Sequence, residues 1–238
     1  MTPDEMVDKL LDPFSDTNDG VVVNNLLDEF WRGYPIENLR RLLVPATIGN
    51  AAFLVSELGQ RIRPLIREVA DLLEDETPRV RGDAISALAQ CTTWEDGWAV
   101  AKVIKAIGDP HDGVRRTACN ALRYMESSKM RAGLEYLRLH EPASVFSTFR
   151  NAFLAIESQP RKAIATIEKL LHSDDPVARR FGAAMIVRPR LYIDPAFVAL
   201  SASVEDTEVA EWVEDATKAP LPPWAKWEGP LKRTDENA

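Results

Sequence analysis

Three histidines and two cysteines are the side chains best suited to hold a metal or act as nucleophiles in this 238-residue chain. His111, His140 and His172 are expected near helix ends or in turns, and nothing in their spacing brings them to a common point. Cys91 and Cys119 occupy positions where a small apolar side chain belongs, and free cysteine is among the most buried residue types. The sequence has no Cys-x-x-Cys pair and no Cys/His cluster with zinc spacing, so we expect no metal and no cofactor.

Motifs for phosphate binding or nucleophilic catalysis are also absent from the sequence. It contains no phosphate-cradling glycine loop, no Gly-x-Ser-x-Gly elbow and no His-Glu-x-x-His pair. The acid pairs Glu95-Asp96 and Asp174-Asp175 fall at expected helix starts, where free N–H groups and the helix dipole favour carboxylates. Capping explains these acids without catalysis, and the sequence therefore favours a non-catalytic protein.

A helical motif that recurs about every 32 residues must position any functional side chain, because a period of this length is typical of stacked repeats. One clear copy runs from Asp75 to Arg81 and is followed by small residues at Ala84 and Ala87; a second starts at Asp109. Weaker copies complete the series. The paired anchor positions of the six copies are 48/49, 80/81, 114/115, 145/146, 178/179 and 209/210.

Each copy is expected to form two helices. The first has apolar residues at helical spacing, as in the segment from Ile62 to Leu73. The second presents a small face, which lets neighbouring helices approach closely. Prolines lie in or just before the first turn of several second helices, where the missing N–H costs little; these are Pro78, Pro110, Pro142 and Pro176. We predict an all-α fold, a right-handed α-solenoid of about six two-helix repeats with an N-terminal capping helix.

These copies resemble the HEAT-like repeat family in its short form of about thirty residues, the kind named after phycobilisome lyases. In that family an Asp in the turn and an Arg six residues later form a ladder between neighbouring repeats. Asp75 and Arg81 keep this spacing, whereas Ser173 stands at the Asp position before Arg179. The resemblance rests on Asp75, Pro78, Val80 and Arg81, on Asp109, Val114 and Arg115, and on Pro176, Ala178 and Arg179. It implies that Arg81, Arg115 and Arg179 are structural.

Three regions are expected along the chain. Residues 1–34 form an acidic segment and a capping helix, residues 35–219 form the HEAT-like solenoid, and residues 220–238 form a tail that contains proline and tryptophan. We expect Trp224 and Trp227 to fold back onto the last repeat; the alternative is an exposed recognition segment. The end of the tail, from Lys232 onward, is expected to be disordered. No run of 18 apolar residues and no secretory signal is present, so we expect a cytoplasmic protein without a membrane span.

Charge is segregated along the chain, which has a net charge of −8 and a pI near 5.1. Residues 1–30 and residues 191–217 each carry a net charge of −7, whereas residues 31–190 carry +5. An acidic protein of this kind is poorly suited to binding phosphate backbones. Acidic ends would instead steer a basic partner.

The resemblance implies that the second helices line a concave surface along which the repeats bind a partner. Positions on these helices outside the small face are our candidates for binding. They include arginines and aromatic residues, which commonly anchor protein interfaces. The candidates are Arg79, Asp83, Arg116, Asn120, Tyr124, Asn151, Arg180, Phe181, Arg188, Glu208, Glu211 and Trp212.

Three classes of function fit these observations. We favour a non-catalytic protein-binding scaffold, specifically an immunity-type inhibitor that binds and neutralises a bacterial toxin, because several immunity proteins look like small acidic HEAT-like domains. Its partner would be another protein, such as a basic toxin domain. The alternatives are a nucleic-acid-binding protein similar to the HEAT-like alkylpurine DNA glycosylases, which the low pI disfavours, and a protein related to the bilin lyases.

Overall fold

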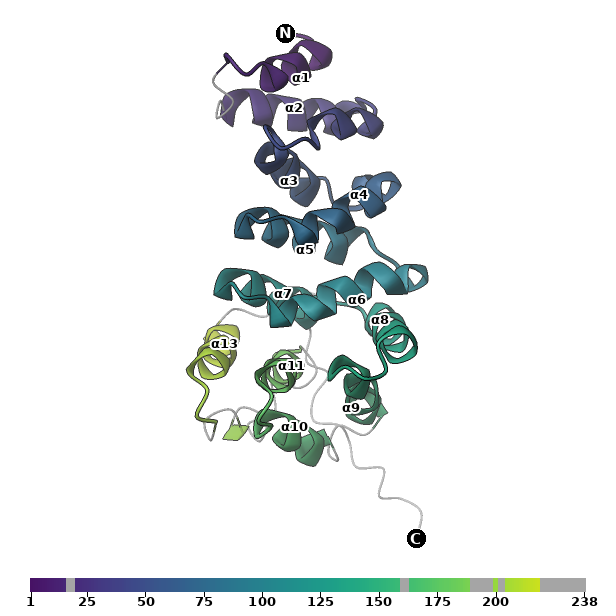
Figure 1. Ribbon diagram of the computed structural model, residues 1–238, viewed down its shortest axis with the longest axis vertical. Helices are drawn as coiled ribbons and strands as arrows, with labels where there is room; N and C mark the ends of the chain where they lie inside the picture. The colour runs from purple at the N-terminus through teal and green to yellow at the C-terminus, as the bar shows by residue number, and fades with distance from the viewer. Residues whose placement is uncertain (16–19, 159–162, 189–198, 201–203, 219–238) are drawn as a thin grey trace.

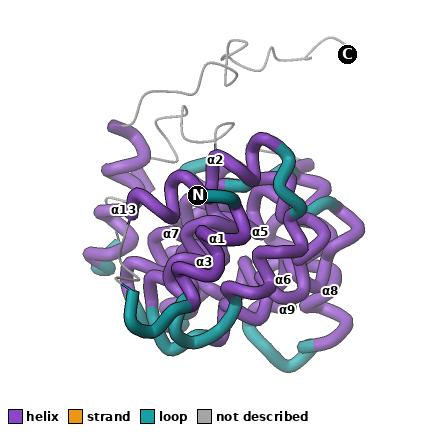
Figure 2. Tube along the Cα trace, turned by 90° about the horizontal axis from the view of Figure 1, so that it is seen from above, coloured by secondary structure: helices purple, strands orange, loops and turns teal. Residues whose placement is uncertain are grey.

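The computed structural model describes residues 1–15, 20–158, 163–188, 199–200 and 204–218. Within these ranges every regular element is a helix and no strand occurs (Figures 1 and 2). The all-α prediction is therefore confirmed. The predicted tail from residue 220 onward lies outside the described residues.

Two helices cover the N-terminal end of the stack. Helix α1 (Pro3–Leu11) starts with a capping box in which the Thr2 hydroxyl and the Glu5 carboxylate satisfy each other's backbone N–H groups. Helix α2 (Gly20–Arg32) buries Leu26 and Phe30 beneath α1 and against the first repeat. A short helix followed by a capping helix is the arrangement that the sequence predicts.

The second helices of all six repeats occur where the anchor pairs predict them. The alanines of their small faces, among them Ala84, Ala87 and Ala118, are completely buried, so adjacent helices pack closely. The second helices are α3 (Ile48–Glu57), α5 (Pro78–Cys91), α7 (Asp112–Tyr124), α9 (Phe146–Ser158), α11 (Pro176–Ile186) and α13 (Thr207–Lys218).

The first elements of the early repeats are broken into short turns, whereas later ones are continuous helices. Pro64 lies inside one of these segments, where its ring and missing N–H interrupt α-helical bonding. The first elements are η1 (Ile36–Leu42), then η2 (Gly59–Leu65), α4 (Ile66–Asp71) and η3 (Leu72–Glu74), then η4 (Trp94–Asp96), α6 (Gly97–Lys105) and η5 (Ala106–Gly108), then α8 (Ser127–His140) and α10 (Ala163–Leu171).

The regular stack of second helices is interrupted after α7. Helix α3 packs on α5 and α5 packs on α7, but the next helix against α7 is α11 rather than α9, and α13 packs on α11 (Figure 1). In α9 the bulky Phe149 and Phe153 stand at the positions that Ala118 and Leu122 occupy in α7. Because Phe149 stacks on Phe181 of α11, with ring centroids 4.2 Å apart, α9 packs on α11 and leaves α7. The predicted α-solenoid of about six repeats is thus present, and its packing becomes irregular after α7, where α11 and α13 fold back.

Candidate functional site

Arg81 joins two neighbouring repeats through four hydrogen bonds. Its Nη1 donates to the carbonyl oxygens of Asp75 and Glu76, at 2.9 and 3.1 Å, in the turn before its own helix. Its Nε and Nη2 each donate at 2.8 Å to the carboxylate of Asp109, in the next turn along the stack. The Asp109 carboxylate also accepts the backbone N–H of His111 at 2.8 Å. A bidentate pair of this kind fixes the spacing of the repeats.

Arg179 repeats this arrangement near the C-terminal end. Its Nη1 donates to the carbonyl oxygen of Ser173 at 2.8 Å, and its Nε donates to the Asp206 carboxylate at 2.7 Å. Since the bond six residues back uses a backbone carbonyl, Ser173 serves as well as an aspartate there. The ladder implied by the resemblance is present, and its acid is the one in the following turn.

The surroundings of the two ladder acids, Asp109 and Asp206, favour their charged forms. Burial alone would raise the pKa of Asp109, but the hydrogen bonds and charge of Arg81 and the His111 N–H hold it below its ordinary value. The same balance, with Arg179 and the Val209 N–H, lowers the pKa of Asp206. These side chains stabilise the stack and are not available to a ligand.

Arg115 departs from the regular ladder. Its Nη1 donates to the carbonyl oxygen of Asp109 at 2.9 Å, as expected, but Ala143 stands where the next carboxylate would be. Its Nε instead donates at 2.7 Å to Glu208 of α13. Glu208 also accepts the Nε of Arg180 at 3.1 Å. One carboxylate therefore ties α13 to both α7 and α11.

Several predicted binding residues are buried by this folding back, which corrects the expectation that they lie on an open surface. Phe181 is completely buried against Phe149, and only 7% of Trp212 is exposed. Arg188 is buried and donates to the carbonyl oxygen of Leu122 at 2.8 Å, so it joins α11 to α7. Arg180 and Glu208 are paired with each other. The sequence could not show the contact of Arg188 because Leu122 lies 66 residues away.

The remaining candidates are accessible but fall in two groups. Asn151 on α9 and Glu211 on α13 are exposed and lie on separate helices. The other five lie on the adjacent helices α5 and α7 and are brought together. We define the α5–α7 face as Arg79, Asp83, Ser86 and Gln90 of α5 and Arg116, Thr117, Asn120 and Tyr124 of α7.

A groove of about 490 Å³ runs between the two helices of the α5–α7 face. Gly82 and Gly113 form part of its lining, and Thr117 and His111 lie on its α7 side. Arg79 is 77% exposed at its edge, and its Nε is 3.9 Å from the Asp83 carboxylate. Arg79 and Asp83 are among the candidates predicted from the sequence, whereas the glycines are not, although a glycine in each of two neighbouring helices is a signal of open space between them.

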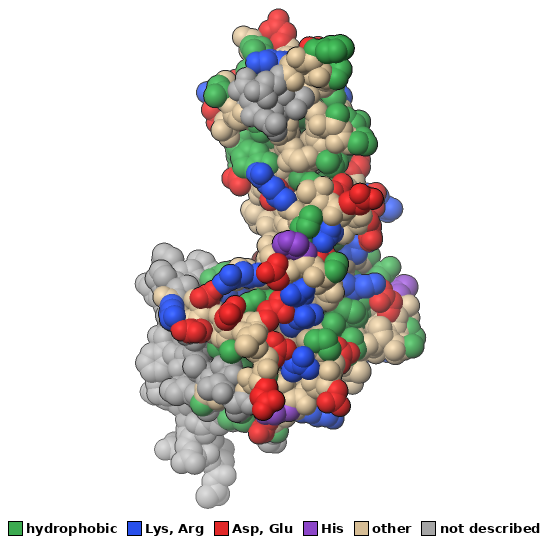
Figure 3. Space-filling model, turned by 60° about the vertical axis from the view of Figure 1, so that its left-hand side comes forward, with side chains coloured by type: hydrophobic (Ala, Val, Ile, Leu, Met, Phe, Trp, Pro, Cys, Tyr) green, Lys and Arg blue, Asp and Glu red, His purple; other side chains and the backbone are tan. Residues whose placement is uncertain are grey.

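The border of the face is set by α13. Arg116 forms an ion pair with Asp215, so the folded-back helix lies beside α7. Lys or Arg and Asp or Glu side chains are interspersed over the side of the molecule drawn in Figure 3. That side consequently has mixed charge and no continuous basic stripe.

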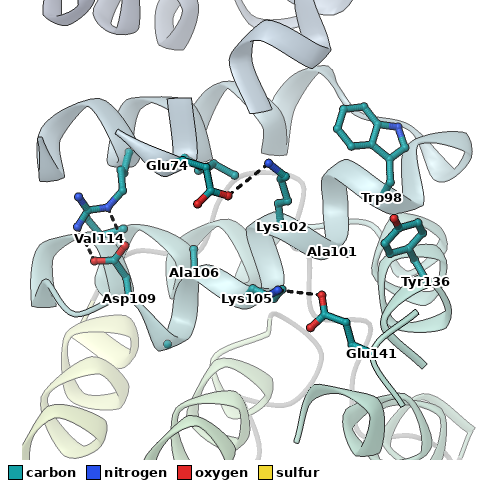
Figure 4. Close-up of a pocket in the computed structure, with 13 residues that line it drawn as sticks. Glu74, Trp98, Ala101, Lys102, Lys105, Ala106, Asp109, Val114, Tyr136 and Glu141 are labelled. Carbon is teal, nitrogen blue, oxygen red and sulfur yellow. Dashed lines mark hydrogen bonds and ion pairs between the residues drawn. The ribbon is translucent and has the colours of Figure 1, made fainter. Parts of the chain in front are cut away.

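A second cavity, of about 370 Å³, is lined mainly by first elements of the repeats (Figure 4). Trp98 of α6 and Tyr136 of α8 form its aromatic end. The Nζ of Lys102 lies 3.4 Å from Oε1 of Glu74, and the Nζ of Lys105 lies 2.8 Å from Oε1 of Glu141. Both lysines are therefore neutralised within the protein. This cavity was not predicted from the sequence, because the candidate residues were all chosen on second helices and most of the cavity lining comes from first elements.

Histidines and cysteines have local structural roles. The His111 ring accepts the N–H of Gly113 and caps α7, while the rings of His140 and His172 lie 2.9 Å from carbonyl oxygens one turn back in their own helices. Burial raises the pKa of the Cys91 thiol to about 11 and that of Cys119 to about 12. Among the described residues no group of three or more His, Cys, Asp or Glu side chains could hold a metal ion.

The chain is similar to several known repeat proteins. Residues 66–148 match the family model described as HEAT repeats. No curated protein matches the chain. An archaeal HEAT-like repeats protein from Thermococcus onnurineus NA1 is 11% identical over 91% of this chain and 98% of that chain, with a TM-score of 0.48. A designed armadillo repeat protein is 16% identical over 91% of this chain and 98% of that chain, with a TM-score of 0.45. Within the described part of the chain, no helix meets the length and hydropathy needed to cross a bilayer.

Proposed function

Since residues 66–148 of this chain are HEAT repeats, we propose that the chain is a non-catalytic scaffold that binds another protein through the α5–α7 face. Repeats of this kind present extended surfaces to their partners. The observation that carries the proposal is the contrast between two sets of polar residues. The ladder arginines are committed to ion pairs within the stack, whereas Arg79 and Asn120 on the α5–α7 face are exposed.

A basic partner suits the charge of the chain. The net charge is −8, and residues 1–30 alone contribute −7. Such a charge raises the rate of encounter with a basic domain and lowers it with a nucleic acid. Ion pairing further reduces the cations free to contact phosphate, since Arg81, Arg115 and Arg179 each bind a carboxylate.

Within this class we propose an immunity-type inhibitor whose partner is a basic toxin domain. Support comes from the acidic charge of the chain and from the accessible polar residues of the α5–α7 face. An inhibitor needs only to cover the active surface of its partner. It therefore requires complementarity of shape and charge rather than chemistry of its own.

Affinity capture tests the proposal. The immobilised chain is compared with the double variant Arg79→Glu/Asn120→Arg, which changes two exposed positions of the α5–α7 face. The control, Ala165→Arg/Lys169→Glu, changes two exposed positions of α10. We expect one protein to be retained by the wild type and the control and lost by the face variant. Equal capture by all three would contradict binding through this face.

A growth assay then tests the finer proposal. The captured protein is expressed alone and together with this chain in the same cells. Inhibition of growth by the partner alone and recovery on co-expression would support immunity. Submicromolar binding of duplex DNA at about 150 mM salt, where phosphate contacts are already weakened, would favour the nucleic-acid alternative instead.

A further inference from the structure

Asp83 is an acid at the centre of the groove between α5 and α7 that the fold itself does not use. Its Oδ2 is buried, and no donor among the described residues lies within hydrogen-bond distance of it. The closest cation is the Nε of Arg79 at 3.9 Å, on a side chain that is 77% exposed. An ion pair with so exposed a partner at this distance contributes little to the stability of the fold. A buried carboxylate oxygen without a donor is costly, so its presence calls for a functional explanation.

Two hydroxyl side chains that line the groove with Asp83 present acceptors rather than donors. The Ser86 hydroxyl donates to the carbonyl oxygen of Gly82 at 3.2 Å, and the Thr117 hydroxyl donates to that of Gly113 at 2.9 Å. Because each hydroxyl has one proton, both oxygens can accept a further bond but have no proton left to give. The groove therefore combines a carboxylate with two hydroxyl acceptors.

Space for an incoming group is provided by the glycines. A Cβ at Gly82 would meet only the Thr117 hydroxyl, at an ordinary contact distance of 3.7 Å, so no packing within the protein demands a glycine there. Glycine in a helix interior destabilises the helix relative to alanine. Its occurrence facing the groove leaves room between the helices that an alanine would reduce.

We propose that this groove binds one cationic side chain, an arginine or a lysine, of the protein partner. The inference rests on the proposed function and identifies the chemistry that the α5–α7 face recognises. A guanidinium or ammonium group would donate to the Asp83 carboxylate and to the Ser86 and Thr117 oxygens in a charge-assisted arrangement. Arg79 would be displaced from the edge of the groove at little cost because its side chain is exposed.

The charge around the groove favours a cation over an anion. Burial, with a further contribution from Glu57 of α3, raises the pKa of Asp83 above its ordinary value although Arg79 opposes the change. An anion would meet the Asp83 carboxylate and be repelled further by the charge of Glu57, against the exposed Arg79. A cation would relieve the unfavourable burial of the Asp83 charge.

Two small cations test the inference without the partner. The ¹⁵N-labelled chain is titrated with ethylguanidinium and with butylammonium, and with ethylurea as the neutral isostere of the first. We expect the cations to shift the amide resonances of Gly82, Asp83, Gly113 and Thr117, and ethylurea not to. The cation that binds more tightly indicates whether arginine or lysine is preferred. Equal shifts with ethylurea would overturn the assignment of a cation site.

Matched variants separate this inference from the proposed function. Asp83→Asn keeps the shape of the side chain and should weaken cation binding about tenfold or more, whereas Asp71→Asn, at an exposed position of α4, should not. Retained binding by Asp83→Asn would overturn the site. If Asp83→Asn loses the probes but captures the partner protein as well as the wild type does, the partner does not use the groove. The inference then fails while the proposed function stands.

Discussion

Arginine side chains in this protein differ in role because their surroundings differ. Arg81 is nearly buried and bonded to two repeats, Arg188 is buried and joins distant helices, and Arg79 is exposed at the edge of a groove. The role of Arg81 could be predicted from sequence because its carbonyl partner in the turn is six residues away. That of Arg188 could not, since Leu122 is 66 residues distant and only folding brings them together.

Replacing Arg81 by alanine should lower the free energy of unfolding by about 2–4 kcal/mol, because it leaves the Asp109 carboxylate without its cation in a largely buried position. The matched control is Arg79→Ala, two residues earlier on the same helix, which should change stability by less than about 0.5 kcal/mol. Urea denaturation of both variants measures the difference. Similar effects for the two would contradict the distinction between a ladder residue and a surface residue.

Asp83→Asn should raise stability near neutral pH. The carboxyl faces Arg79 on its own helix, Glu57 on α3 and His111 at the start of α7, and its pKa is raised above the ordinary 3.8 by burial and by Glu57. A raised pKa in the folded state means that stability falls as pH rises through that pKa. The advantage of the variant should therefore be greatest at about pH 7 and shrink towards about pH 4, as urea denaturation at the two values would show. A constant difference would contradict the raised pKa.

At the scale of the elements, the six second helices could be predicted because their anchor pairs recur at a regular spacing. The change of packing after α7 could not be read from helix propensity, but two signals for it exist in the sequence. Phe149 and Phe153 replace the smaller residues of the inner face, and Ala143 replaces the acid that Arg115 would bind. Both changes lie in the copy anchored at residues 145 and 146, which is one of the weak copies of the motif. Neither signal identifies α13 as the helix that supplies the carboxylate for Arg115.

Glycine substitutions distinguish the tight helix contact from the open one. At Gly133 of α8 a Cβ would lie 2.6 Å from Cγ1 of Val100 and 2.9 Å from Cδ1 of Ile104, so Gly133→Ala should destabilise the α6–α8 contact by about 1–3 kcal/mol. Gly82→Ala should instead stabilise α5 by about 0.5–1 kcal/mol, because nothing within the protein obstructs the added methyl group. Thermal denaturation of the two single variants should give shifts of opposite sign. Shifts of the same sign would contradict the packing described for these two helices.

At the scale of the whole molecule, the C-terminal repeats close against the middle of the chain. Helices α3, α5 and α7 form a regular stack, and α11 and α13 then fold back beside α7 (Figure 1). Folding back buries Phe181 and Trp212 and thereby restricts the accessible part of the second helices. The accessible candidate residues that remain side by side are those of the α5–α7 face, which is bordered by the ion pair between Arg116 and Asp215.

Glu208 is the residue on which this closure should depend most, because its single carboxylate binds both Arg115 and Arg180, whose side chains are largely buried. Glu208→Ala leaves two arginines without their acid, so hydrogen exchange of α13 amides should become about tenfold faster or more. Exchange in α3 and α5 should stay unchanged, since these helices do not contact α13. The control is Glu211→Ala, which removes an exposed acid from the same helix with the same change in helix propensity.

Hydrogen exchange followed by mass spectrometry resolves the helices separately. Faster exchange throughout the chain would instead mean that the folded-back end and the stack unfold as one unit, and unchanged exchange in α13 would mean that Glu208 does not hold the closure.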